Sequence, residues 1–70
     1  MKVQFTKYGL KHDYRGVHVR WTVGSRHYLA TVVSMYRREV PAAIMFSTRH
    51  FNGEQAPDVA ASAVEVLERD

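Results

Sequence analysis

Apolar and polar residues alternate most clearly in the first half of the chain. The apolar members of the first alternating run are Val17, Val19, Trp21 and Val23. This is the period of a half-buried strand. Gly24 and Ser25 separate it from a second run, residues 26–36, that is rich in β-branched and aromatic side chains. Two such runs separated by two residues predict a β-hairpin with a primed turn.

The two-residue turn also predicts the register of this hairpin, because loop length fixes which residues are opposed. The expected pairs are Val23 with Arg26, Trp21 with Tyr28, Val19 with Ala30 and Val17 with Val32. Opposed residues share a face, so one apolar face is expected to hold Val17, Val19, Trp21, Tyr28, Ala30 and Val32. The other face holds His18, Arg20, Thr22, His27, Leu29 and Thr31. The alternative is a helix at residues 27–38, which the β-branched run at residues 31–33 disfavours.

Three further segments complete a predicted sheet. Residues 2–7 alternate, with Val3 and Phe5 on one side, and predict a first strand. Residues 8–15 are interpreted as a polar loop, and residues 37–40 as a second connection. Residues 42–50 follow Pro41 and predict a fourth strand, in which either Ile44 and Phe46 or Met45 faces the core.

The end of the chain predicts a helix over residues 57–69. Pro57 fits a first helical position, and Asp58 suits the positive end of the helix dipole. The apolar residues lie on one stripe at helical spacing: Val59, Ala60, Ala63, Val64, Val66 and Leu67. The predicted fold class is therefore α+β, a four-stranded antiparallel β-meander with one C-terminal α-helix packed on its apolar face.

Length and composition narrow the class of protein. Seventy residues predict a single domain, residues 1–70, with a small core. There is no cysteine, which excludes disulfide scaffolds and thiolate chemistry and favours a reducing compartment. The sequence has neither a signal-peptide pattern nor an apolar stretch of membrane-spanning length. We expect a complete, soluble, cytoplasmic protein without a membrane partner.

Charge is distributed unevenly along the chain. Residues 1–38 carry eight Lys and Arg against Asp13 alone, a net charge of +7. Residues 39–70 carry two against six carboxylates, a net charge of −4. In a meander, the loops at residues 8–15 and 37–40 lie at the same end of the sheet. That end would gather Lys7, Lys11, Arg15, Arg37 and Arg38, with Tyr8 and Tyr14 among them.

Two interpretations of this basic end remain open. Arginine forks match phosphates and tyrosine rings stack on bases, which indicates an anion-binding surface. Alternatively, carboxylates at the end of the predicted helix neutralise the cations, namely Glu65, Glu68 and Asp70. A second candidate surface is the polar sheet face around His18, Arg20 and His27, joined by Lys2 and Gln4. Apolar residues are expected on that face too, at Leu29, Val33 and Met35, and they indicate a protein interface or a homodimer.

Metal binding and catalysis are not expected. His18 and His27 share a face but lie about four residues apart along it, roughly 13 Å, which one zinc ion cannot span. The serines lack the spacing of a nucleophile elbow, and the acidic residues do not converge on a cleft. We therefore expect no catalytic residue, no metal and no cofactor.

The sequence thus favours a small non-enzymatic binding protein. The leading hypothesis is a nucleic-acid-binding or nucleic-acid-associated regulator that uses the basic loop end together with Arg20, His18 and His27. The alternative is an inhibitor or adaptor that docks on an acidic or nucleic-acid-handling host protein and blocks it sterically. In size and composition the chain resembles proteins of that kind from phages and mobile elements.

Overall fold

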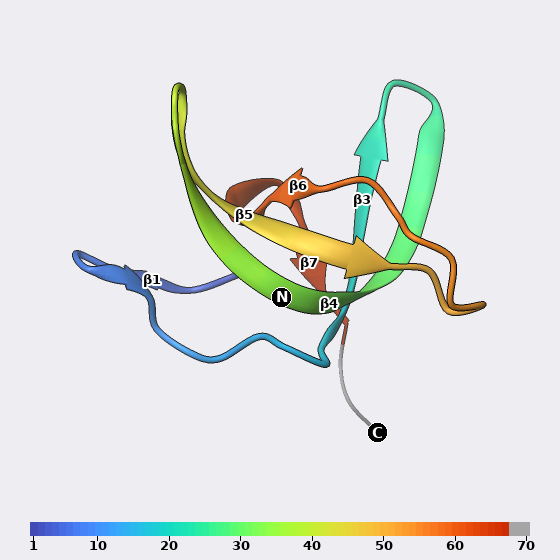
Figure 1. Ribbon diagram of the computed structural model, residues 1–70, viewed down its shortest axis with the longest axis horizontal. Helices are drawn as coiled ribbons and strands as arrows, with labels where there is room; N and C mark the ends of the chain where they lie inside the picture. Colours follow the sequence, from blue (N-terminus) through green and yellow to red (C-terminus); the bar gives the residue numbers. More distant parts are fainter. Residues whose placement is uncertain (68–70) are drawn as a thin grey trace.

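The computed structural model describes residues 1–67 and is built mainly of β-strands (Figure 1). Its elements are β1 (Phe5–Thr6), β2 (Gly9–Leu10), β3 (His18–Val23), β4 (Arg26–Glu39), β5 (Ala42–Arg49), β6 (Val59–Ala60), the 3-10 helix η1 (Ala61–Ala63) and β7 (Glu65–Val66). β1 and β2 pair with each other, and the other strands form one sheet in the order β6-β5-β4-β3-β7. Residues 1–67 contain no α-helix, and so none long and apolar enough to cross a membrane. The predicted α+β class is therefore wrong, because the protein is mostly β.

The β3–β4 hairpin has the predicted register. Its pairs include Val23 with Arg26, Trp21 with Tyr28 and Val19 with Ala30. Gly24 has a φ of 61° and no non-glycine residue has a positive φ in the described chain. A positive φ at only the first central residue is typical of a type II′ turn. The predicted apolar face is buried or half-buried, and the opposite face is largely exposed. The strand interpretation of residues 27–38 is confirmed over the helix.

A β-bulge at Val33 changes which later side chains of β4 face the core. The residues on either side of it pair with adjacent residues of β5, Val32 with Thr48 and Ser34 with Ser47. A bulge inserts one residue and so reverses the alternation beyond it. Met35 consequently packs against the core cluster. The expectation that it shares an outer face with Leu29 and Val33 is wrong.

β4 continues through the loop that was predicted at residues 37–40. Arg37 pairs with Ile44, Arg38 pairs with Ala43, and the strand ends at Glu39. Successive side chains of a strand point to opposite faces. The two arginines therefore lie on opposite faces of β4 and are not gathered together in a loop.

β5 confirms the predicted fourth strand and resolves its register. Phe46 is fully buried and Ile44 packs against the same cluster, so this pair faces the core. Thr48 is also buried, and its hydroxyl donates a hydrogen bond of 2.8 Å to the Pro57 carbonyl. Met45 is buried outside that cluster. By register it lies in one row with Tyr36 of β4 and Ala60 of β6.

Residues 59–66 form strands and a turn that curl the sheet into a small barrel, in place of the predicted helix (Figure 1). β6 pairs with β5 at one edge of the sheet, and β7 pairs with β3 at the other. In a flat five-stranded sheet these edges would be about 19 Å apart, at about 4.8 Å between strands. Residues 61–64 connect them through η1, and a 3-10 turn rises only about 2 Å per residue. The sheet must therefore curl until its edges approach each other.

The helix prediction is wrong because the apolar spacing of this segment also fits a strand–turn–strand path. Val59, Ala61 and Val64 are buried and belong to the core cluster. Valine suits strands, and alanine is compatible with either path. Closing the sheet buries these side chains against a preformed concave face, and tertiary burial outweighs the propensity of a short helix. The predicted helical residues 68 and 69 lie outside the described residues.

The N-terminal segment covers one end of the barrel, and its predicted strand is only partly present. β1 is limited to Phe5–Thr6, and Lys2 forms an isolated bridge to Glu65 of β7. Val3 is buried whereas Phe5 is 46% exposed, so only part of the expected apolar side contributes to the core. The barrel core consists of Val3, Tyr14, Val19, Trp21, Ala30, Val32, Phe46, Ala56, Val59, Ala61 and Val64.

Candidate functional site

Tyr8 lies at the tip of the β1–β2 hairpin with its backbone fixed and its ring in solvent. Its N–H donates to the Thr6 hydroxyl at 3.2 Å, and that hydroxyl donates to the Gly9 carbonyl at 3.4 Å. The Tyr8 carbonyl accepts a hydrogen bond of 3.5 Å from Nη2 of Arg37. The side chain is nevertheless 82% exposed. The ring of Tyr8 is therefore a large aromatic surface that is mostly open to solvent.

Two cations lie close to Tyr8, one beside its ring and one at its backbone carbonyl. The Lys7 ammonium lies 5.3 Å from the ring centroid, within the range of a cation–π contact. Arg37 reaches the hairpin from β4, and in Figure 1 the β1–β2 hairpin and the β4–β5 turn lie on the same side of the barrel. Neither cation forms an ion pair with a residue of the described chain. We call Lys7, Tyr8 and Arg37 the hairpin-tip cluster.

The structure brings together only part of the predicted basic end. Lys11 follows β2 on the same hairpin, is exposed, and has a backbone N–H that donates to the Gln4 carbonyl at 3.0 Å. Arg38 lies on the other face of β4, where its Nε donates to the Pro41 carbonyl at 3.0 Å. Tyr14 is buried in the core, contrary to its predicted place in a polar loop.

Arg15 forms an ion pair with its neighbour Asp13. Its Nη2 lies 2.7 Å from Oδ2 of Asp13, its Nε donates to the same carboxylate, and its backbone N–H donates to Oδ1 at 3.0 Å. The hydrogen bond from the Arg15 side chain is the main reason that the pKa of Asp13 falls to about 2. The pair is local and exposed, and it leaves little net charge at this point of the surface.

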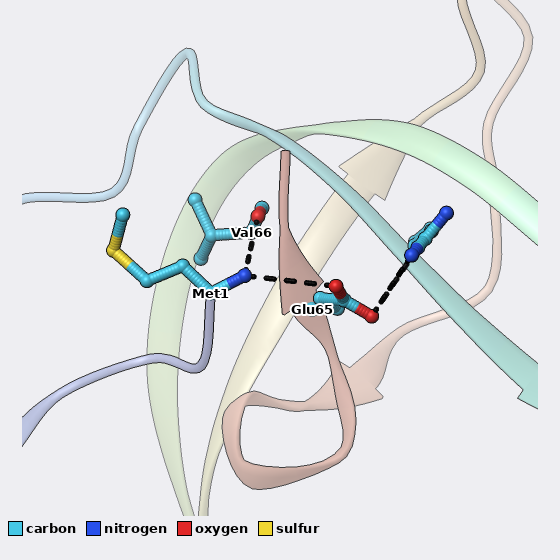
Figure 2. Close-up of polar contacts among 4 residues, drawn as sticks. Met1, Glu65 and Val66 are labelled. Atoms are coloured by element: carbon cyan, nitrogen blue, oxygen red, sulfur yellow. Dashed lines mark hydrogen bonds and ion pairs between the residues drawn. The ribbon is translucent and has the colours of Figure 1, made fainter. Parts of the chain in front are cut away.

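Arg20 is paired with Glu65 across the β3–β7 edge. Its Nη2 and Nε lie 3.2 and 3.3 Å from Oε2 of Glu65, and this hydrogen bonding lowers the pKa of the Glu65 carboxyl. Figure 2 shows the Met1 α-amino group between the same carboxylate, at 3.6 Å, and the Val66 carbonyl, at 3.1 Å. Glu65 therefore neutralises Arg20, not Lys11, Arg37 or Arg38. Glu68 and Asp70, the other carboxylates expected to do so, lie outside the described residues.

The two histidines of the predicted sheet-face site, His18 and His27, have different neighbours in the structure. His27 is exposed and lines a shallow hollow with Lys2 and Arg20. His18 packs instead against the ring of Phe51, with 4.8 Å between ring centroids. Phe51 was not among the predicted site residues, because residues 51–56 lie between the predicted fourth strand and the predicted helix. Its one available signal was a large aromatic residue next to Asn-Gly, a sequence typical of an exposed turn.

No protein-family model, characterised protein or solved structure matches this chain. What the protein does must therefore be argued from its own surface.

The described surface offers cations and exposed rings but no converging set of reactive groups. Within residues 1–67, no three His, Asp or Glu side chains lie close enough together to hold a metal ion. The shifted pKa values are those of groups in exposed ion pairs, Asp13, Arg15 and Glu65, and that of Tyr36, which donates a hydrogen bond to Asp58. The hairpin-tip cluster is thus a place on the described surface where an exposed aromatic ring and unpaired positive charge coincide.

Proposed function

We propose that this protein is a non-catalytic module that binds single-stranded nucleic acid through the hairpin-tip cluster. A base stacks on the Tyr8 ring, and Lys7 and Arg37 contact the phosphates on either side of it. The observation that carries the proposal is the exposed ring of Tyr8, with the Lys7 ammonium beside the ring and Arg37 bonded to the Tyr8 carbonyl. Neither cation has a carboxylate partner in the described chain.

The chemistry of Arg37 supports this role. A guanidinium has five N–H donors, and one bond to the Tyr8 carbonyl leaves the others free for a phosphate. The same bond links β4 to the backbone of the β1–β2 hairpin and so places the Arg37 guanidinium next to Tyr8. Such preorganisation reduces the entropy that binding would otherwise cost.

A single strand fits better than a duplex. The bases of a duplex are stacked on each other and present only their edges, whereas the faces of unpaired bases are free to stack on tyrosine. A two-stranded hairpin tip is also too small to fill a groove with several side chains. Sequence preference should be weak, because every base has a π-face.

The test is fluorescence anisotropy with labelled oligothymidylate of about twelve nucleotides at about 50 and 200 mM salt. The double variant Lys7→Gln/Arg37→Gln removes two phosphate contacts. At about 0.7 in log–log salt slope per contact, it should lose about 65-fold in affinity at 50 mM and about 10-fold at 200 mM. The salt slope itself should fall by about 1.4.

The matched control is Lys2→Gln/Arg26→Gln, which changes net charge equally at exposed positions away from the hairpin tip. We expect the decrease in the logarithm of the affinity to be less than a third as large for this control as for the hairpin-tip variant. Equal losses in the two variants would mean that net charge, not the cluster, governs binding. If the native protein binds no single strand even at low salt, the proposal fails, and docking on a protein partner becomes the better hypothesis.

A further inference from the structure

A second hollow lies on the outer face of the barrel, where the chain leaves β5. It has a volume of about 540 Å³, and its lining includes His18, Val33, Arg49, His50 and Phe51. The hollow is remote in sequence from the β1–β2 hairpin. Val33, the unpaired residue of the β-bulge, is part of its lining.

The turn that carries Phe51 is tightly held. The N–H of His50 donates to the Glu54 carbonyl at 2.8 Å, and the N–H of Gly53 donates to the His50 carbonyl at 2.9 Å. Gly53 adopts a φ of 91°, which a side chain would strain. These bonds hold Phe51 against the His18 ring, with the planes tilted by 48°, while leaving Phe51 59% exposed.

The charge of the hollow is of one sign. Arg49 contributes a guanidinium that forms no ion pair with a described residue, and His18 and His50 add two imidazoles. No carboxylate is among the described residues that line it. An aromatic platform beside an unpaired cation suits a ligand that is both planar and anionic. A nucleotide has both properties, through its base and its phosphate.

We propose that this hollow is a second nucleotide subsite, in which a base stacks on Phe51 and its phosphate contacts Arg49. The proposal rests on the proposed function, because it assigns the subsite to the same bound strand. It extends the interface beyond the hairpin tip and predicts a footprint of several nucleotides, within the range of about 4–16 that small barrels cover.

The substitution Phe51→Ala removes the platform and should weaken binding of the oligothymidylate by about 5- to 10-fold, at the lower end of what one stacked base contributes. Arg49→Gln should weaken it by about 5-fold or more at low salt. The controls are Val23→Ala and Arg26→Gln, which make comparable changes at exposed residues of the β3–β4 turn, and they should leave affinity within 2-fold.

A Phe51→Trp variant gives a direct readout. The native tryptophan, Trp21, is 6% exposed in the core, so a change in emission on adding the strand reports on the indole introduced in the hollow. We expect quenching that saturates at the same oligonucleotide concentration as the anisotropy.

The outcomes separate the subsite from the proposed function. If Lys7→Gln/Arg37→Gln weakens binding but Phe51→Ala and Arg49→Gln do not, the hairpin tip binds and the second subsite is refuted. Saturated binding without quenching of the Phe51→Trp variant refutes it as well. If the native protein binds no strand, both proposals fall.

Discussion

The substitution Ala61→Gln tests the barrel closure, because strand closure and the predicted helix assign opposite environments to Ala61 and Ala63. In the structure Ala61 is fully buried and Ala63 is exposed. On the predicted helix, Ala63 would be on the buried stripe and Ala61 would not. A glutamine at residue 61 must bury an amide without partners, at about 1–3 kcal/mol, and overfill the core, at a further 1–3 kcal/mol.

We therefore expect Ala61→Gln to destabilise the protein by about 2–6 kcal/mol and Ala63→Gln by no more than about 0.5 kcal/mol. A domain of this length has a free energy of unfolding of about 3.5–10 kcal/mol, so the first change removes a large share of it. The assay is urea unfolding followed by the fluorescence of Trp21, with the milder Ala61→Ser as a second variant in case Ala61→Gln does not fold. A larger loss at residue 63 than at residue 61 would refute the closure.

Three further predictions concern local contacts. The Arg15 side chain lowers the pKa of Asp13 to about 2. The Asp13 carboxylate therefore stabilises the fold at pH values above its ordinary pKa of 3.8, and this stabilisation is lost as pH falls towards 2. Carboxyl NMR titration should show this, and Arg15→Gln should return the pKa towards its ordinary value. The Tyr36 hydroxyl donates a 2.6 Å hydrogen bond to Asp58, and this bond raises the pKa of Tyr36. Its contribution to the stability of the fold is present below pH 10 and is lost as pH rises through the raised pKa. The substitution Asp58→Asn should lower the pKa of Tyr36 again, as measured by NMR titration of the phenol. Gly24→Ala places a side chain at a φ of 61° in open space and should cost about 1–2 kcal/mol in urea unfolding, through backbone strain alone.

The central hairpin could be predicted from the sequence because two independent signals agree on it. The alternation of apolar residues in β3 and the two-residue turn at Gly24 both require Trp21 to face Tyr28, and the two rings stack with centroids 5.2 Å apart. The segment at residues 57–69 lacked such agreement. Its alanines and valines fit a helical stripe as well as a strand–turn–strand path, and the concave sheet that decides between them is a property of the whole chain.

The β-bulge could not be predicted from the local sequence pattern. It accounts for the wrong predictions about Met35 and about the placing of Arg37 and Arg38. One unpaired residue at Val33 turns Met35 towards the core and so sets the faces of Arg37 and Arg38. Arg37 does reach the Tyr8 carbonyl, next to Lys7 in the chain, but it does so from within β4 and not from the loop predicted at residues 37–40. The pairing of Arg15 and Arg20 with carboxylates could not be read from composition, because an ion pair depends on which side chains are adjacent in space.

The most direct test of the account is an NMR titration of the isotopically labelled protein with single-stranded oligothymidylate at low salt. We predict that the largest amide shifts fall on Lys7, Tyr8 and Gly9 and on Arg37 across from them, with a second group at residues 49–51. Shifts at both places that saturate together would place one strand on both surfaces. An absence of shifts at residues 5–10, or the largest shifts at the β3–β4 turn at residues 23–26, would contradict the account.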